Sequence, residues 1–354
     1  MLSEQIPHDF LPTASIVTLK RRAKLLATIR DFFDSSGYFE VETPLLSADI
    51  VTDAWLEPFV ADWIPLPTEW NRIGDRRFLQ TSPEFAMKRL IAAGADSIYQ
   101  LGKVFRNGEF GQRHNPEFTM VEWYRVGDNL SALMSCTQSL VQRVVSVGAD
   151  LVNSDEEPVL TELASRVLHP AGFERLTYQD AFLRKTGCSV LTCKMSELHA
   201  VAGQQGLVPP PGLAADDRDG WLNFLLAELI EPSLGRERPT FLTNYPASQA
   251  ALARLSPDGV TAERFELYLD GIELCNGYDE LTDPDALRKR IREQAEQRAE
   301  SGLRPLPANS RLLAAMDAGF PPCSGNALGV DRLVMLALGK SKLAEVIPFP
   351  FDIA

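Results

Sequence analysis

The chain has 354 residues, of which 45% are hydrophobic and 23% charged, and its formal net charge is −13. These fractions are typical of a soluble protein with a sizeable core, and the acidic excess disfavours a large nucleic-acid footprint, because dedicated binders carry a basic face. No apolar run approaches the roughly 20 residues needed to cross a bilayer, and no basic region followed by an apolar segment opens the chain, so neither a membrane span nor a signal peptide is expected.

The cysteines are five in number and none forms a CxxC pair: Cys136, Cys188, Cys193, Cys275 and Cys323. An odd count without metal-ligand spacing favours a reducing cytoplasm and disfavours a structural zinc site. The four histidines are too scattered along the sequence to predict a metal cluster.

The N-terminal region is expected to form an extended arm over residues 1–17. Apolar residues then recur at helical spacing and predict a helix over residues 18–36 that ends at Gly37. The basic residues on its first turns are interpreted as a solvated face: Lys20, Arg21, Arg22 and Lys24. A strand that ends in Pro44 is predicted over residues 38–44.

Residues 78–84 predict a strand that closes into a helix, with Pro83 near the first helical turn. Ser82 and Glu84 therefore lie at a helix entrance. A short polar side chain there is often only a helix cap, and this alternative explains Ser82 well.

A hairpin is predicted next, with strands over residues 99–105 and 118–124. Its connection is polar and carries Arg106, Arg113, His114, Asn115 and Glu117, with Phe118 at the start of the returning strand. An arginine fork matches phosphate oxygens in pairs, and an aromatic ring offers a stacking face for a flat base. The alternative is a surface hairpin with ordinary charges.

An amphipathic helix is predicted over residues 129–147. Residues 150–240 are less regular, with helical stretches at 177–185, 194–202 and 221–229. We interpret 150–240 as an insertion on the core and a candidate for partner specificity.

Two further strands are predicted within residues 262–281, joined by the turn Asp270-Gly271, after a strand at 241–246. Glu266 and Glu273 fall on facing strands, where paired carboxylates can hold a hard divalent cation against phosphate oxygens. With Asn276 and Glu280 beside them, the acidic pocket also suits a substrate with two ammonium groups. A lone glutamate at a strand edge is usually only solvated.

The C-terminal part begins with a charged helix at 283–302, interpreted as solvent-facing. A glycine-bearing strand then leads into a helix that starts near Arg332, within residues 325–338. Glycine lets a ligand approach the backbone, and a helix N-terminus with a guanidinium favours phosphate. The alternative is a buried strand–helix corner.

These segments together resemble the class II aminoacyl-tRNA synthetases. The hairpin resembles motif 2, and its sequence HNPEFTM…EWY is similar to that of the lysyl subgroup. Residues 18–44 resemble motif 1, which forms the dimer interface in the family. Residues 325–338 resemble motif 3. The resemblance implies an α+β fold with a mainly antiparallel sheet flanked by helices, a catalytic domain over 18–354, and a homodimer. It is weakest over 150–240.

The resemblance also implies roles for single residues. Arg106 and Arg332 would be catalytic, with Arg106 on the α-phosphate and the substrate carboxylate, and Phe118 and Arg332 would enclose the adenine. The ATP site would comprise Arg106, Asn107, Gly108, His114, Asn115, Phe118, Glu273, Leu274, Gly329 and Arg332. The amino-acid pocket would comprise Ser82, Pro83, Glu84, Glu122, Tyr124, Asn276, Glu280 and Ala327. Mg²⁺ would lie on Glu266 and Glu273.

Over the whole chain the resemblance is to freestanding paralogues of the lysyl enzymes that attach (R)-β-lysine to elongation factor P. The tRNA-charging enzymes carry an anticodon-binding OB-fold before motif 1, whereas fewer than twenty residues precede the first predicted helix here. We therefore expect no anticodon-binding domain and no stable tRNA binding. The alternatives are a short lysyl-tRNA synthetase and an inactive regulatory paralogue; the latter would be marked by loss of Arg106, Glu273 or Arg332, and all three are present.

The sequence departs from the lysyl pattern at two positions. Gly108 stands where the lysyl enzymes usually have glutamate, with Glu109 beside it. Ala327 replaces the middle glycine of motif 3, and one methyl group can separate homologous substrates by about 1–3 kcal/mol. This difference suits a pocket reshaped for a β-amino acid.

Overall fold

The structure is a computed structural model that describes residues 10–66, 68, 74–152, 158–308 and 310–354. Most of the expected N-terminal arm, residues 1–9, lies outside the described residues. Helix α1 (Ile16–Ser35) begins before the predicted position because Ser15 caps it, its Oγ accepting a hydrogen bond from the Thr18 amide at 3.1 Å. Gly37 follows at φ 80°, a left-handed conformation that ends the helix where the sequence predicts.

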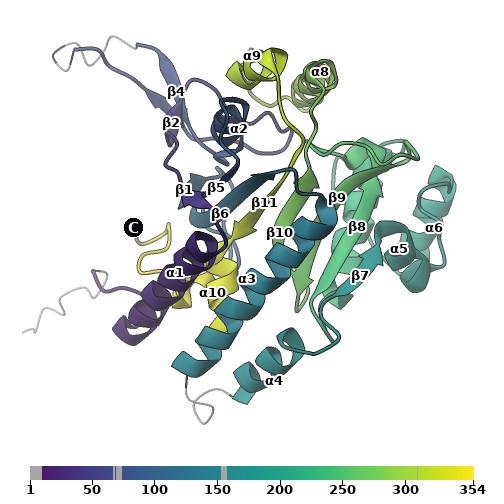
Figure 1. Cartoon of the computed structure of the whole chain (residues 1–354). Helices are drawn as coiled ribbons and strands as arrows, with labels where there is room; N and C mark the ends of the chain where they lie inside the picture. The colour runs from purple at the N-terminus through teal and green to yellow at the C-terminus, as the bar shows by residue number, and fades with distance from the viewer. Residues whose placement is uncertain (1–9, 67, 69–73, 153–157, 309) are drawn as a thin grey trace, which may run out of the picture.

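One sheet occupies the centre of the molecule (Figure 1). Its strands are β1 (Phe39–Glu40), β5 (Ser97–Phe105), β6 (Glu117–Val126), β7 (Glu174–Thr177), β8 (Thr240–Pro246), β9 (Thr261–Leu269), β10 (Ile272–Asp279) and β11 (Cys323–Gly329). Their order is β1-β5-β6-β11-β10-β9-β8-β7. Among the strands of the described ranges, β1–β5 and β7–β8 pair in parallel and the other neighbours in this sheet are antiparallel. The predicted α+β class with a mainly antiparallel sheet is confirmed.

Both predicted hairpins are present. β5 and β6 pair along their whole length, and β9 turns into β10 at Asp270 and Gly271, whose φ angles of 54° and 69° are those of a two-residue hairpin turn. The strand predicted over 38–44 is shorter than expected. After Glu40 the Val41 amide still bonds the β5 backbone, whereas the Thr43 amide donates to the side chain of Gln100 on β5 at 2.8 Å.

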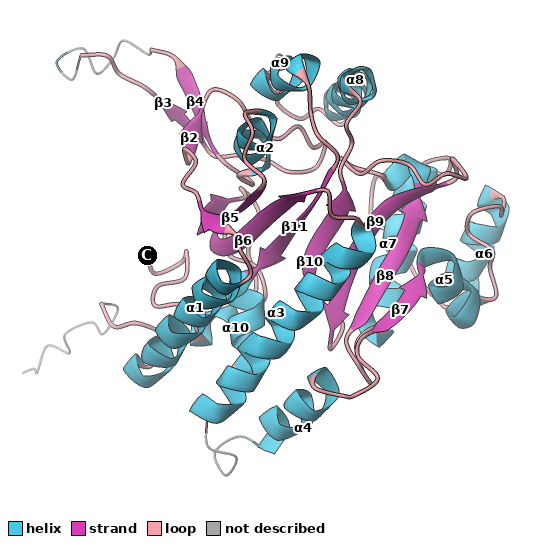
Figure 2. Cartoon of the chain, in the orientation of Figure 1, coloured by secondary structure: helices cyan, strands magenta, loops and turns pink. Residues whose placement is uncertain are grey.

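Three helices cover one face of the sheet (Figure 2): α1, α3 (Leu130–Leu151) and α10 (Val330–Ala337). The predicted helix at 129–147 corresponds to α3, which Asn129 caps. Phe33 stacks on Tyr99 with 4.7 Å between the ring centres and also contacts Trp123 of β6. This buried layer is the main hydrophobic core.

Residues 150–240 extend the sheet at its far edge as well as covering it. They supply the edge strand β7, together with α4 (Pro158–Val167), α5 (Tyr178–Thr186), α6 (Met195–Gln204) and α7 (Arg218–Leu225), a π-helical turn (Leu226–Ile230) and a 3-10 turn, η3 (Glu231–Ser233). Tyr178, Phe182 and Trp221 form part of a second buried cluster there.

A second, smaller group of strands and helices lies beside the main sheet. It contains β2 (Leu46–Ser47), β3 (Val60–Asp62), β4 (Arg76–Leu79), α2 (Glu84–Ala92), α8 (Pro284–Glu300) and α9 (Arg311–Ala318). The solvent-facing interpretation of the helix at 283–302 is wrong for one side of α8. Leu287, Ile291 and Arg298 share a helix face and are buried.

Arg22 also departs from its predicted solvated position. Its guanidinium is buried, 2.5 Å from a carboxylate oxygen of Asp331, and Nη2 donates to the Thr119 hydroxyl at 3.0 Å. A buried charge needs such a partner, and the pair joins α1, β6 and α10. All five cysteines carry free thiols, and none of the helices in the described ranges has the length and hydropathy to span a membrane.

Candidate active site

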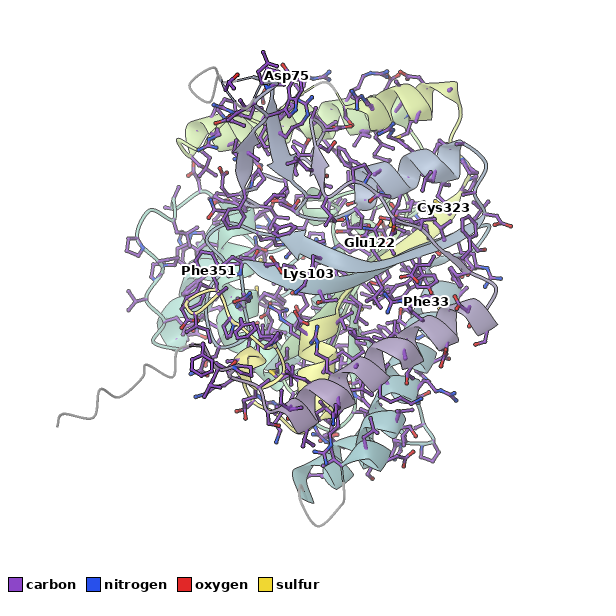
Figure 3. The ribbon with its side chains drawn as sticks, turned by 90° about the vertical axis from the view of Figure 1, so that its left-hand side faces the viewer. Phe33, Asp75, Lys103, Glu122, Cys323 and Phe351 are labelled. Carbon is purple, nitrogen blue, oxygen red and sulfur yellow. The ribbon has the colours of Figure 1, made fainter. Side chains whose placement is uncertain are left out.

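The two faces of β6 have opposite character. Side chains alternate along a strand, so Val121 and Trp123 enter the core while Met120, Glu122 and Tyr124 point into a cleft of about 2000 Å³ on the other side. Figure 3 shows this division, with Phe33 on the α1 side of the hairpin and Glu122 above the strand.

Most of the residues predicted from the sequence line this one cleft. They are Ser82, Glu84, Arg106, His114, Asn115, Phe118, Glu122, Tyr124, Glu266, Glu273, Leu274, Asn276, Glu280, Ala327, Gly329 and Arg332. Pro83, Asn107 and Gly108 do not line it. Pro83 precedes α2, and Gly108 forms a turn at φ 85° while the neighbouring Glu109 faces the cleft.

The acidic end of the cleft is built around Glu122. This carboxylate is buried and accepts hydrogen bonds from Ser82 Oγ at 2.7 Å and Tyr124 OH at 2.6 Å. Burial and the nearby Glu84 raise the pKa of Glu122 to about 7. Ser82 also accepts from the Glu84 amide at 3.0 Å, a local bond at the helix entrance, although Pro83 rather than Ser82 occupies the N-cap position of α2.

Lys88 is a residue of this end that the sequence analysis missed. Its Nζ lies 2.5 Å from Glu84 and 2.5 Å from Glu280, and 4% of its side chain is exposed. Burial opposes the charge on Lys88, but Glu280 and Glu84 outweigh burial and raise its pKa. Burial also disfavours the charged form of Glu280 and so raises the pKa of this carboxyl to about 8, although Lys88 opposes the shift. The i,i+4 spacing of Glu84 and Lys88 was the available signal.

β11 forms the floor between β6 and β10. A side chain at Gly325 would bring its Cβ within 2.3 Å of the Tyr124 ring and 2.7 Å of Glu280 Oε1, so this position requires glycine. Ala327 tolerates its methyl group and lies opposite Glu122 on one side and Asn276 on the other.

Two arginines mark the opposite end of the cleft. The Arg106 guanidinium lies over the Phe118 ring, 5.2 Å from its centre, and is 3.6 Å from Glu109. Arg332 donates to the Glu273 carbonyl at 2.8 Å and contacts His114 Nε2 at 2.7 Å. The guanidiniums therefore belong to one region and present several donors for an anion.

His114 and Asn115 differ in their partners. Burial and Arg332 lower the pKa of His114, which favours a neutral ring. The Asn115 amide donates to the Glu117 carbonyl at 2.6 Å and accepts from the Phe351 amide at 2.9 Å. Asn115 therefore holds the C-terminal segment against the hairpin connection.

The predicted metal ligands lie on β9 and β10. Glu266 accepts from Arg264 at 2.5 Å and from Tyr268 at 2.6 Å. Burial and Glu266 raise the pKa of Glu273, although 41% of its side chain is exposed. Burial and Glu266 also raise the pKa of Glu231 on η3. Crowded carboxylates of this kind fit a divalent cation, but no group of three or more potential ligands is found among the described residues. Phosphate oxygens would have to complete the shell.

The fold and the cleft agree with the family comparison. The family model for class II tRNA synthetases (D, K and N) matches residues 9–353, and the chain belongs to this family. The predicted resemblance is therefore confirmed.

Curated relatives narrow the position of the chain within the family. A protein of Vibrio cholerae is 44% identical over 97% of this chain and 98% of its own length. A protein of Vibrio vulnificus is 42% identical over 98% and 99%, and one of Proteus mirabilis is 42% identical over 97% and 97%. All three carry the name elongation factor P–(R)-β-lysine ligase.

Proposed function

We propose that this protein activates (R)-β-lysine with ATP as an acyl-adenylate and transfers the acyl group to the ε-amine of a lysine of elongation factor P, in the cytoplasm. The observation that carries the proposal is one cleft with arginines at one end and buried carboxylates at the other. Family membership implies the use of ATP, and the names of the relatives support the amino acid and the acceptor.

The residues suit a reaction that depends on positioning. The substrate carboxylate attacks the α-phosphorus, pyrophosphate leaves, and Arg106 stabilises the charge on the phosphate oxygens. The acceptor amine then attacks the acyl carbon, loses a proton and releases AMP. No nucleophilic side chain is required. Mg²⁺, when bound through Glu266 and Glu273, would neutralise phosphate charge.

The acidic end suits a substrate with two ammonium groups. Glu122 is held in place by Ser82 and Tyr124. Glu280 is 1% exposed; its Oε2 lies 2.5 Å from Lys88 Nζ, whereas its Oε1 has no hydrogen-bond partner within the described part of the chain. A buried acceptor of this kind favours a bound ammonium group.

We further propose a single catalytic domain over residues 18–354 that forms a homodimer. Phe39, in the segment that resembles motif 1, is 51% exposed, and Leu46, two residues after that segment, is 46% exposed. Apolar side chains exposed together favour contact with a second subunit.

The test is pyrophosphate exchange with α-lysine and (R)-β-lysine, followed by labelling of elongation factor P or tRNA from the same adenylate. The proposal predicts exchange that favours (R)-β-lysine and label on the protein. Label on tRNA would instead support a short lysyl-tRNA synthetase. The absence of exchange with either amino acid would support the inactive paralogue.

A further inference from the structure

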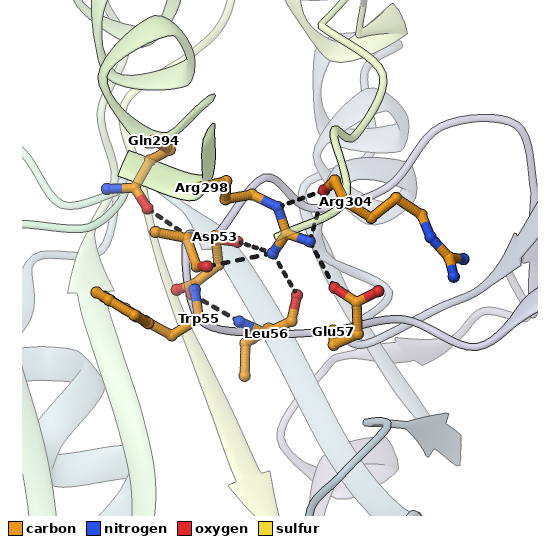
Figure 4. Close-up of polar contacts among 8 residues, drawn as sticks. Asp53, Trp55, Leu56, Glu57, Gln294, Arg298 and Arg304 are labelled. Atoms are coloured by element: carbon orange, nitrogen blue, oxygen red, sulfur yellow. Dashed lines mark hydrogen bonds and ion pairs between the residues drawn. The ribbon is translucent and has the colours of Figure 1, made fainter. Parts of the chain in front are cut away.

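The C-terminal turns of α8 contain a buried arginine whose role the proposed function leaves open. Arg298 is 1% exposed although it belongs to a highly charged helix. Its guanidinium donates to the carbonyls of Asp53, Ala54 and Leu56 at 3.2–3.3 Å, and to the Arg304 carbonyl at 2.8 and 3.0 Å (Figure 4). Nη2 also pairs with Glu57 at 2.5 Å.

These bonds concentrate on residues 53–57, of which Asp53, Trp55 and Leu56 line the cleft. Gln294 adds a bond from the same helix, since its Oε1 accepts from the Ala54 amide at 2.6 Å. Apolar burial contributes little at Trp55, which is 68% exposed. Hydrogen bonds from α8 therefore determine where this segment lies, because a buried guanidinium enforces the geometry of its acceptors.

The 53–57 segment in turn contacts the connection that carries Arg106. The Glu57 carbonyl accepts from the Asn107 amide at 2.7 Å, as an isolated antiparallel bridge. The Arg106 amide donates to the Pro116 carbonyl at 2.9 Å. The backbone on either side of the Arg106 side chain is thus held at two points, one inside the hairpin and one dependent on residues 53–57.

We propose that Arg298 is a positioning residue for amino-acid activation. Through the 53–57 segment and the Glu57–Asn107 bridge, it fixes the start of the 106–116 connection and so the direction of Arg106. The inference rests on the proposed function for its kinetic consequence. A displacement of about 1 Å at a reacting group can cost roughly a hundredfold in rate.

The test compares Arg298→Met and Arg298→Lys with Arg292→Met, a matched control at an exposed position of the same helix. Amide hydrogen exchange is followed in peptides that cover residues 53–57 and 106–116, with β6 as the reference. In Arg298→Met we expect exchange at Asn107 to accelerate at least about tenfold, since the segment that pairs with it is released. Arg298→Lys should give an intermediate value, and Arg292→Met and the β6 peptide should not change.

The kinetic readout is pyrophosphate exchange per titrated active site. For Arg298→Met kcat should fall about ten- to a hundredfold, with KM for the amino acid within about twofold. If the lower rate of pyrophosphate exchange were explained entirely by a smaller number of active sites, Arg298 would have a merely structural role, and the proposal would be overturned. The proposal would also be overturned if amide hydrogen exchange became faster in residues 53–57 without any change at Asn107, or if it accelerated equally in β6.

If Arg298→Met does not fold, Arg298→Lys carries the test, and normal protection at Asn107 together with normal kcat in it would refute the inference. If the wild-type protein catalyses no pyrophosphate exchange with either amino acid, the proposed function fails. Amide hydrogen exchange would still test the link from Arg298 to Asn107.

Discussion

Replacing Ala327 with glycine should change which amino acid the enzyme activates. Ala327 lies on the cleft face of β11, opposite Glu122 and Asn276. Glu122 is held by two hydrogen bonds and cannot easily move away from its strand. Both α-lysine and (R)-β-lysine carry two ammonium groups and a carboxylate, so the carboxylates of the pocket alone discriminate poorly between them. The methyl group instead restricts where an amine can lie.

The expected size of the effect follows from one methyl group. Relief of its steric exclusion should improve activation of α-lysine relative to (R)-β-lysine by about 1–3 kcal/mol, or roughly ten- to two-hundredfold. The assay is the ratio of kcat/KM for the two amino acids in pyrophosphate exchange. Glycine within a strand also costs stability, on the order of 0.5–1 kcal/mol, so unfolding is measured in parallel. A ratio that stays within about twofold would place the discrimination elsewhere.

Four further predictions concern charged groups of the same cleft. Arg106→Ala should abolish adenylate formation in a folded protein; near-normal pyrophosphate exchange would remove Arg106 from the phosphate site. Glu273→Gln should raise the Mg²⁺ concentration required for exchange, because an amide supplies no charge to a hard cation; an unchanged titration would rule out this ligand. Lys88→Met should lower the free energy of unfolding in urea by about 3–5 kcal/mol, since it leaves Glu84 and Glu280 buried without their partner, and adding Glu280→Gln should recover part of the loss. A loss below about 1 kcal/mol would mean that the pair is solvated. Finally, burial raises the pKa of Glu280 above the ordinary value of 4.5, although Lys88 opposes this, so the contribution of Glu280 to wild-type stability should fall as pH rises through its titration in the folded state. Glu280→Gln should flatten this slope, and equal slopes would contradict the raised pKa.

The parts of the fold that were predictable from the sequence are those with local signals. The turn at Asp270-Gly271 and the glycine after α1 each act within a few residues, and the structure contains both. The length of β1 was less predictable, because its end depends on the distant Gln100 side chain.

The buried charges escaped prediction because their partners are distant in sequence. Lys88 pairs with Glu280, Arg22 with Asp331, and Arg298 with residues 53–57. Each looks like an ordinary surface charge until the fold supplies its acceptor. Composition and periodicity contain no signal for such pairs.

The register of β6 and β11 determines how the substrates of the proposed reaction would be arranged along the cleft. Phe118, Met120, Glu122 and Tyr124 all face the cleft, and Phe118 and Glu122 are about 13 Å apart along the strand at ~3.3 Å per residue. A nucleotide beside Phe118 and an ammonium group beside Glu122 place the reacting carboxylate near Met120. Gly329 lies opposite Met120, where the absence of a side chain lets the substrate approach the backbone. Because a slip of one residue would turn all these side chains to the other face, the pairing of β6 with β11 fixes both ends of the site together.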